Sequence, residues 1–337
     1  MMVLRLMGAL ALACLSTGFV FQPDHHSTYL NSRVPARFDL SKDQADGSYW
    51  SSTFLTTTTG KQYLAVSHVL GSLSKSSILE LDTLRYWNDI AYSESSDSNT
   101  TPNSSAFSIR AGDYAFGSES ADGISTMYTF GSSANYSYNF SLAASSKVLL
   151  NGGGGAITFG SGYANSTEWA IPACKTGGTL TLEEEILQID PAKSLTWYDH
   201  QKCFGAPRNW TWFELHFPGS SIKASIWAYD LLASPSAEAR FATVRLGQDS
   251  SSLLAYELTP DMHDVWKSPN SNITYPLKWK LDFENGDYLW VKSIRPDQEI
   301  YGSRQIGDTV YAGFATVSGR FLGQRIRFGV VEMITLY

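Results

Sequence analysis

Apolar and polar residues alternate with a period of two through most of this chain, and long amphipathic helical patterns are nearly absent. A period of two is typical of β-strands, whose successive side chains point to opposite faces of a sheet. Short strands at regular spacing predict an all-β sandwich or barrel. In the first half such runs occur at 53–59, 63–70, 77–81, 106–111, 124–130, 136–143 and 180–189.

The second half contains eight candidate strands joined by short turns. Eight antiparallel strands close a lipocalin-type barrel that can hold one small ligand. A chain of 337 residues also exceeds the roughly 250–300 residues that one core supports. We therefore expect an N-terminal β-sandwich or open barrel over 19–206 and a C-terminal barrel over 207–337. The eight strands are expected at 211–217, 223–232, 239–246, 252–259, 277–283, 288–294, 310–319 and 324–336.

The N-terminus has the pattern of a secretory signal. Arg5 precedes an apolar run over 6–15, and small residues then lead to Gly18, so residues 1–18 are predicted to be removed. The run is too short to span a bilayer, and no later stretch approaches the required length, so we expect a secreted protein without a membrane anchor. In an oxidising compartment, Cys174 and Cys203 are expected to form a disulfide. Predicted glycosylation sites follow the Asn-x-Ser/Thr pattern at Asn99, Asn103, Asn135, Asn139, Asn165, Asn209 and Asn272.

Charge and motifs exclude several classes of function. The net charge is -7 and the basic residues are scattered, which argues against a nucleic-acid partner. The sequence has no motif for a metal pair on a helix, for a nucleotide phosphate or for a serine-hydrolase elbow. This argues against metal, nucleotide and serine-hydrolase mechanisms.

Aromatic strands carry the candidate chemistry. In the strand over 209–217, alternation places Trp210, Trp212, Glu214 and His216 on one face. A carboxylate and an imidazole two residues apart are sufficient for proton transfer to one bound ligand. Indoles around a few polar groups are typical of small-molecule sites, although aromatic strand faces are also common in plain cores.

Two further strands add candidates. In 195–201, Asp199 shares a face with Trp197, while Tyr198 and His200 share the other face. Asp199 is a candidate buried acid with a raised pKa, or alternatively a surface group at a strand end. In 63–70, His68 points to an apolar face, as a pocket residue or as a core histidine.

An aromatic box is the second part of the predicted site. Its walls are expected to be Trp50, Trp197, Trp212 and Trp279, with His216 or Tyr198 as hydrogen-bond donor. Such a box folds a flexible substrate into a reactive conformation and so removes entropy from the barrier.

Several segments resemble a known family. The segments over 48–70, 195–201, 209–217, 273–281 and 310–333 are similar to the hydroxyneurosporene synthase/AttH-like family, in its fungal branch with kievitone hydratase and Diels–Alderases. The resemblance implies two lipocalin-like domains, a ligand pocket at or near their interface, and no metal or organic cofactor. Many relatives carry a Glu where this chain has Gly313, and Glu332 or Glu214 are the candidate replacements.

Three functions follow from the resemblance and the candidate residues. The first is a pericyclase that forms a diene or quinone methide from a hydrophobic polyketide or terpenoid and directs its [4+2] cycloaddition. The second is a secreted hydro-lyase similar to kievitone hydratase, acting on a prenylated phenolic. The third is a lipocalin-like carrier without catalysis.

Overall fold

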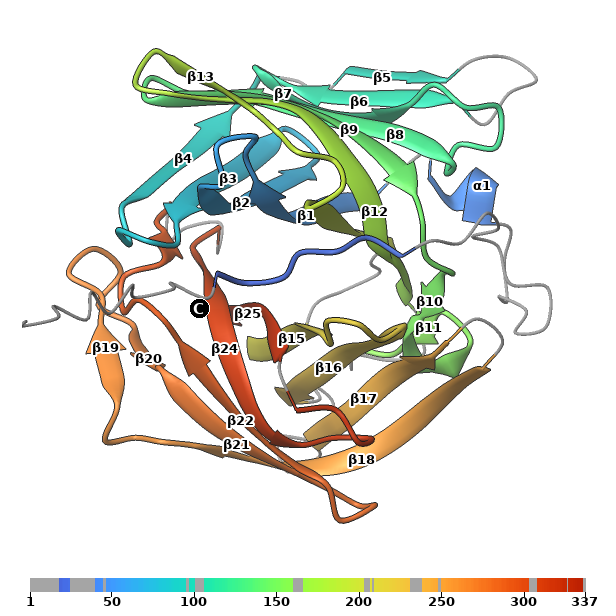
Figure 1. Cartoon of the computed structure of the whole chain (residues 1–337), viewed down its shortest axis with the longest axis vertical. Coiled ribbons are helices and arrows are strands. Elements are labelled where there is room, and N and C mark those ends of the chain that lie inside the picture. The colour runs from blue at the N-terminus through green and yellow to red at the C-terminus, as the bar shows by residue number, and fades with distance from the viewer. Residues whose placement is uncertain are drawn as a thin grey trace, which may run out of the picture.

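The protein is almost entirely β-structure, as the alternation predicts. The computed structural model describes residues 18–24, 40–44, 47–94, 97–100, 106–159, 166–202, 207, 209–230, 238–247, 250–302, 308–325 and 327–335. Within these ranges the helical elements are one α-helical turn, α1 (Leu40–Asp43), and one 3-10 turn, η1 (Asn151–Gly153). The strands form two large sheets, one in each half of the chain (Figure 1).

The first sheet belongs to the N-terminal half and curls over on itself. Its main path runs β4-β3-β2-β1-β14-β12-β9-β8-β7-β6-β5, and β10, β11 and β13 pair with the long strand β12. The strands are β1 (Ser48–Thr56), β2 (Gln62–Leu70), β3 (Leu73–Glu80), β4 (Tyr86–Tyr92), β5 (Asp97–Thr100), β6 (Phe107–Ala111), β7 (Tyr114–Ser118), β8 (Thr126–Ser132), β9 (Tyr136–Ala144), β10 (Leu149–Leu150), β11 (Ala156–Ile157), β12 (Ser166–Leu182), β13 (Glu185–Gln188) and β14 (Leu195–Lys202).

The second sheet closes into a barrel. Its path β22-β21-β18-β17-β16-β15-β25-β24 is completed by pairing of β22 with β24, which gives the predicted eight-stranded ring among the described residues. The strands of this half are β15 (Asn209–His216), β16 (Ile222–Asp230), β17 (Glu238–Leu246), β18 (Ser250–Pro260), β19 (Val265–Lys267), β20 (Thr274–Pro276), β21 (Lys278–Phe283), β22 (Tyr288–Ser293), β23 (Glu299–Ile300), β24 (Val310–Arg320) and β25 (Arg327–Thr335).

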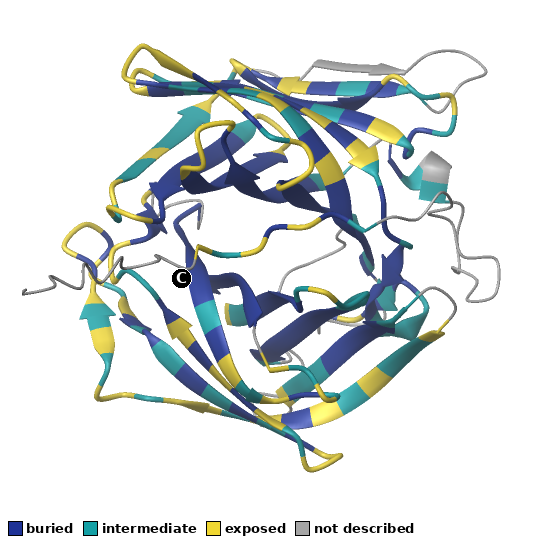
Figure 2. Ribbon diagram, in the orientation of Figure 1, coloured by how far each residue is buried: buried dark blue, intermediate teal, exposed yellow. Residues whose placement is uncertain are grey.

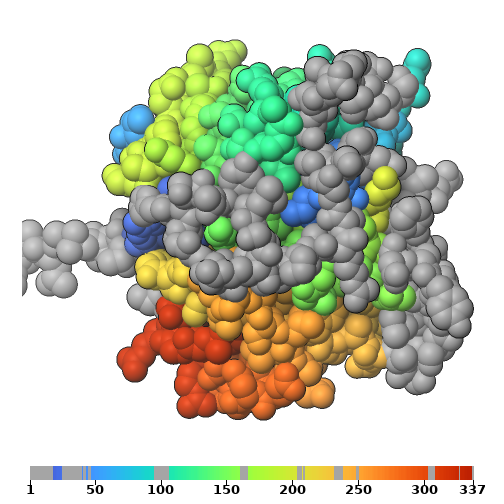
Figure 3. All heavy atoms as spheres, turned by 90° about the vertical axis from the view of Figure 1, so that its right-hand side faces the viewer, coloured from blue at the N-terminus to red at the C-terminus, as the bar shows by residue number. Residues whose placement is uncertain are grey.

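The chain passes from the first sheet to the second between Lys202, the end of β14, and Asn209, the start of β15. The predicted domain boundary at residue 206 falls in this connection, and residues 203–206 lie outside the described part of the chain. Figure 3 shows the N-terminal half, green, stacked on the C-terminal half, orange and red.

Apolar side chains gather in three layers. One cluster lies between the two walls of the curled first sheet, a second between the first sheet and the outside of the barrel, and a third inside the barrel. The strands on both sides of the middle layer are the most continuously buried (Figure 2). The barrel interior is therefore packed with side chains, including Trp279, which lies edge-to-face with Phe213 at 5.5 Å.

One predicted strand is interrupted. The run over 180–189 is a hairpin, because Glu183 and Glu184 have positive φ and turn the end of β12 into β13. The segment over 273–281, which resembles the family, is divided at Leu277 between β20 and β21, so its tyrosine and its tryptophan belong to different sheets.

The predicted disulfide is not formed. Cys174 is a buried free thiol opposite Thr196, whereas β14 ends at Lys202, opposite Thr167. Seven residues of strand separate Thr167 from Cys174, about 23 Å at 3.3 Å per residue, and a disulfide needs Cα atoms within about 7 Å. Cys203 itself lies outside the described part of the chain.

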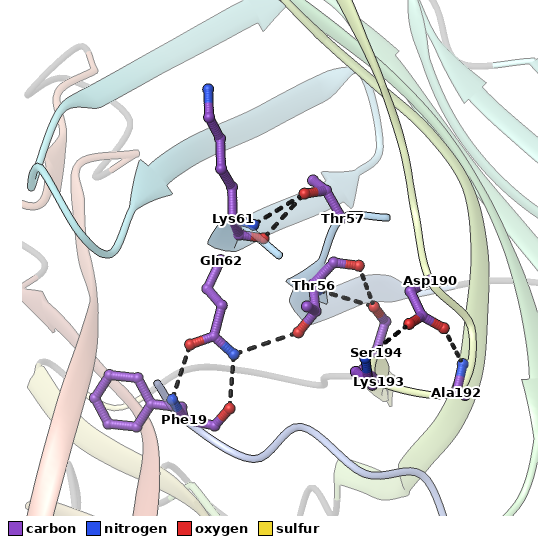
Figure 4. Close-up of polar contacts among 9 residues, drawn as sticks. All are labelled: Phe19, Thr56, Thr57, Lys61, Gln62, Asp190, Ala192, Lys193 and Ser194. Carbon is purple, nitrogen blue, oxygen red and sulfur yellow. Dashed lines mark hydrogen bonds and ion pairs between the residues drawn. The ribbon is translucent and has the colours of Figure 1, made fainter. Parts of the chain in front are cut away.

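An N-terminal segment, residues 18–24, runs between the two halves (Figure 1). Gln62 holds it through its side-chain amide, which accepts a hydrogen bond from the Phe19 N–H at 2.8 Å and donates one to the Phe19 C=O at 2.6 Å (Figure 4). Phe21 packs on Phe54 of β1 and on Phe328 of β25. Residues 1–17 of the predicted signal lie outside the described part.

Four of the predicted glycosylation sites can be examined. Their side chains are exposed, at Asn135, Asn139, Asn209 and Asn272. The side chain of Asn99 and the whole of Asn103 and Asn165 fall outside the description. Glycosylation remains a prediction.

Candidate active site

One row of side chains crosses the first sheet and faces the barrel. Neighbouring strands place Lys75 of β3 opposite His68 of β2, His68 opposite Trp50 of β1, and Trp50 opposite Asp199 of β14. Directly opposite residues in antiparallel strands point to the same face. The row therefore brings together three predicted site residues and one lysine that sequence analysis missed.

A second row lies on the outside of the barrel. Glu332 of β25 is opposite Trp212 of β15, which is opposite Trp227 of β16. Trp212 lies 6.2 Å from Trp50 and 6.0 Å from Trp197, centroid to centroid, so the two sheets meet through their indoles. The alternation predicted for β15 is confirmed, because Phe213 and Leu215 face the barrel interior.

A third carboxylate, Glu168 of β12, joins Asp199 and Glu332 in the layer between the two sheets. It is fully buried and accepts hydrogen bonds from Asn151 at 2.7 Å, from Gln201 at 3.1 Å and from the Trp227 indole at 2.9 Å. Burial raises its pKa well above the usual range, and the nearby Asp199 carboxylate adds to the rise. The sequence offered little signal for Glu168, because Pro172 and the Gly177-Gly178 pair hide the strand.

Asp199 and Glu332 titrate near neutral pH. Burial raises the pKa of Asp199 to about 8, and the negative charge of Glu332 contributes to this rise. Burial also raises the pKa of Glu332 to about 7, while the Lys75 ammonium limits the rise. Because the charge of Glu332 raises the pKa of Asp199, Glu332 is expected to lose its proton at lower pH than Asp199. Near pH 7 the layer thus holds both protonated and ionised carboxyls.

Lys75 supplies the cation of the cluster. Its side chain is buried on β3, and burial lowers its pKa to about 8, against the carboxylates of Glu332 and Asp308. The amine is therefore mostly charged at neutral pH and stabilises the ionised form of Glu332. The sequence signal for it is a lysine that shares its strand face with Leu73 and Leu79.

Glu214 and His216 lie together at one end of the layer. His216 Nε2 is 3.6 Å from Glu214 Oε1, and neither ring nitrogen of His216 has a hydrogen-bond partner among the described residues. The Ser52 hydroxyl lies close enough to Glu214 to lower its pKa by hydrogen bonding. Burial raises the pKa of Glu214 well above its usual range and lowers that of His216 well below it. The His216 ring is held by Phe54 at 4.9 Å, by Phe328 at 5.2 Å and by Trp197 at 5.7 Å.

His68 lies at the edge of the indole cluster. Its Nε2 atom is 2.7 Å from the hydroxyl of Ser48, and its ring lies edge-on to Trp50 at 5.5 Å. Burial, with a contribution from Lys75, lowers its pKa to about 3, so the imidazole is neutral.

Two predicted site residues lie elsewhere. Tyr198 is on the opposite face of β14 from Asp199, where its hydroxyl donates to Gln44 Oε1 at 2.6 Å within the first cluster. Trp279 lies inside the barrel, whose lumen is a packed core. It therefore does not face the layer between the two sheets. Gly313 shares the lumen face, next to Gln298, so the absence of a Glu there leaves the carboxyl cluster unchanged.

No described helix is long and apolar enough to span a bilayer. No group of three His, Cys, Asp or Glu residues among the described residues is arranged to hold a metal ion.

Comparison with known proteins identifies relatives over nearly the whole chain. The AttH-like family model matches residues 71–337. Kievitone hydratase of Fusarium solani subsp. phaseoli is 34% identical, covering 94% of this chain and 91% of that protein. Dehydratase asqC of Emericella nidulans is 32% identical, covering 96% of each. The names of both relatives support an enzyme of the hydro-lyase type.

Solved structures share the fold. The crystal structure of kievitone hydratase from Nectria haematococca has a TM-score of 0.86 at 34% identity, covering 94% of this chain and 98% of that one. An AttH protein from Nitrosomonas europaea has a TM-score of 0.68 at 16% identity, covering 94% and 99%, and shows likeness of fold alone.

Proposed function

We propose that this chain, which belongs to the AttH-like family, is a hydro-lyase that exchanges water with a carbon–carbon double bond of a largely apolar small molecule. The observation that carries the proposal is the layer of four buried carboxyls, Glu168, Asp199, Glu214 and Glu332, set among indoles of the two facing sheets. Hydration and dehydration are the two directions of one reaction, and the relatives are named for both.

Such a reaction needs an acid and a base on one substrate. In hydration the acid gives a proton to one alkene carbon, water attacks the other, and the base takes a proton from that water. Asp199, protonated near pH 7, suits the role of acid. Glu332, whose ionised form Lys75 stabilises, suits the role of base.

The indole rings would stabilise the positively charged intermediate of such a reaction. Protonation of an alkene leaves positive charge on carbon, and the faces of aromatic rings attract cations by about 0.5–2 kcal/mol each. Trp212 contacts both Trp50 and Trp197, and the Asp199 carboxylate lies 3.4 Å from the Trp197 indole nitrogen. An apolar wall also excludes bulk water and so leaves the proton transfers to the cluster.

A pericyclase is the second candidate, favoured by the same indole contacts. Rings that enclose a polyene can fold it for cycloaddition without any proton transfer. A carrier would use the indoles for binding alone. The three functions differ in whether water enters the product and whether the carboxyls are needed.

The experiment is conversion in heavy-oxygen water. Purified protein and D199N are incubated with a panel of apolar phenolics and terpenoids that carry an alkene, beginning with kievitone. A labelled hydroxyl in the product, lost in D199N, supports the hydro-lyase. An unlabelled isomer of unchanged mass would indicate a pericyclase, and tight binding without conversion would indicate a carrier.

A further inference from the structure

We propose that His216 and Glu214 form a proton relay that connects the carboxyl cluster with a solvent pocket at the edge of the interface. This inference rests on the proposed function, because it concerns the proton balance of a hydro-lyase. Neither residue is assigned contact with the substrate, and both act through Asp199.

Each turnover leaves one proton on the wrong carboxyl. After one hydration the acid has lost a proton to carbon and the base has gained one from water, so a proton must leave the base and another must reach the acid before the next turnover. The net reaction takes up no proton, so the two carboxyls are reset by direct transfer or by exchange with water. Exchange of a buried cluster with water needs groups that reach the surface, and the relay is proposed to supply them.

The outer end of the relay is a surface pocket. It has a volume of about 250 Å³, and His216 and Lys223 line it together with Asp24 and Gln22 of the N-terminal segment. Gln22 and Gly219 on its rim are exposed, so the pocket is open to solvent. At about 30 Å³ per water it holds several molecules.

The inner end is the carboxyl of Glu214. Its side chain is fully buried. Burial raises the pKa of Glu214, a hydrogen bond from the Ser52 hydroxyl limits the rise, and the charges of Asp199 and Glu332 add to it. Glu214 also lies two residues along β15 from Trp212, which is opposite Glu332, so it is within electrostatic reach of the carboxyl pair.

His216 joins the two ends. Its Nε2 faces Glu214 at 3.6 Å, longer than a hydrogen bond, so a small rotation of the ring completes the contact. Both ring nitrogens lack partners among the described groups. A neutral imidazole accepts a proton on one nitrogen and releases one from the other, which is the action a relay needs.

Burial and one nearby cation keep His216 neutral. Burial lowers its pKa most, and Lys223, directly opposite on β16, lowers it further, while Asp24 binds Lys223 at 3.2 Å. The elements packed on its ring, β1, β14 and β25, contribute Phe54, Trp197 and Phe328, none of which titrates. Glu214 is therefore its one acidic neighbour at close range among the described residues.

The test follows proton exchange directly and needs no substrate. After a rapid jump from pH 6 to pH 9, the loss of the carboxylic C=O infrared band reports deprotonation of the buried pair, and D199N assigns the band. We expect H216F to slow this loss at least tenfold and added imidazole to restore it. We expect E214Q to slow it without rescue, because the missing step lies inside the protein. S221A, which alters the same pocket, is the matched control and should leave the rate unchanged.

Each outcome decides the proposal. A wild-type rate in both H216F and E214Q would overturn the relay and leave the hydro-lyase intact. A slow rate in H216F that imidazole fails to restore, in a variant with native melting temperature, would also overturn it. Absence of a protonated carboxyl band at pH 6 would remove the proposed acid, and with it both proposals.

Discussion

Lys75 and Glu332 lie on facing sheets, and the ammonium of the first limits how far burial raises the pKa of the second, which stays at about 7. The two residues are 257 positions apart in the chain, on β3 and β25. Their interaction divides the cluster into a carboxyl that is ionised near neutral pH and others that hold their protons. This division gives a hydro-lyase its base beside its acid.

Replacing Lys75 by Met should disable that base. Loss of a nearby opposite charge raises the pKa of a buried carboxyl by about one to three units. We expect the acidic limb of the kcat/KM profile to move upward by a similar amount and activity at pH 7 to fall at least about fivefold. The melting temperature should not fall, because Met removes a buried charge and keeps the volume. An unchanged profile would show that Lys75 does not control Glu332.

Replacing Asp199 by Asn should remove a pH dependence of stability. Folded Asp199 keeps its proton up to about pH 8, whereas the unfolded chain releases it near its ordinary pKa of about 3.9. Between these values the folded state binds more protons, so the wild type loses stability as the pH rises. We expect D199N and wild type to melt at similar temperatures at pH 4, and D199N to melt several degrees higher at pH 9. Parallel melting curves across this range would contradict the raised pKa.

Asp199 should also determine the alkaline limb of activity. If it is the acid, kcat/KM should decline above about pH 8 and D199N should lose about 10²–10⁴ of the rate. E257Q, an exposed carboxyl on β18, is the control and should behave as wild type. A flat profile from pH 6 to pH 10 would exclude Asp199 as proton donor.

Substitutions of two tryptophans should distinguish a role in the interface between the sheets from a role in the barrel core. We expect W279A to lose about 3–5 kcal/mol of unfolding free energy, since it empties the packed lumen. W212F keeps an aromatic ring in the interface but loses the indole hydrogen bond to Ser225. It should lower kcat/KM with a small change in melting temperature. Chemical denaturation and steady-state kinetics on both variants measure the contrast, which would be reversed if the ligand were bound in the lumen.

Cys174 should be found as a free thiol in the native protein. Burial raises its pKa far above the range in which thiols react, so it should resist alkylation until the protein unfolds. Alkylation in denaturant without reductant, followed by mass spectrometry, should label Cys174 fully. Reductant should leave the melting temperature unchanged. Detection of a Cys174–Cys203 peptide would overturn the strand register of β12 and β14.

The strands could be predicted from the sequence where one face of the strand is apolar and the other polar. The eight strands of the barrel are found in their predicted order, because alternation over 209–335 is nearly uninterrupted. β12 was missed, because Pro172 and the Gly177-Gly178 pair break its pattern, although it is the longest strand. Local pattern also gave the faces of β14 and β15 correctly, with Asp199 beside Trp197 and Glu214 beside His216.

The arrangement of the candidate site could be predicted only for residues that lie on the same strand. Alternation assigns residues two apart to one face, but the partner across a sheet depends on register, which the sequence of one strand does not contain. Lys75, His68, Trp50 and Asp199 form one row through three successive pairings. For the same reason the sequence did not show that Trp279 lies inside the barrel, apart from the other three tryptophans of the predicted box.

The segment over 18–24 constrains the order in which the molecule is assembled. Phe19 and Phe21 pack on Phe314 of β24 and Phe328 of β25, strands that the ribosome makes last. The first of the described residues can take their place only after the last strands have formed. Docking of this segment is thus a late step of folding, and it ties the beginning of the chain to its end across the layer that holds the carboxyls.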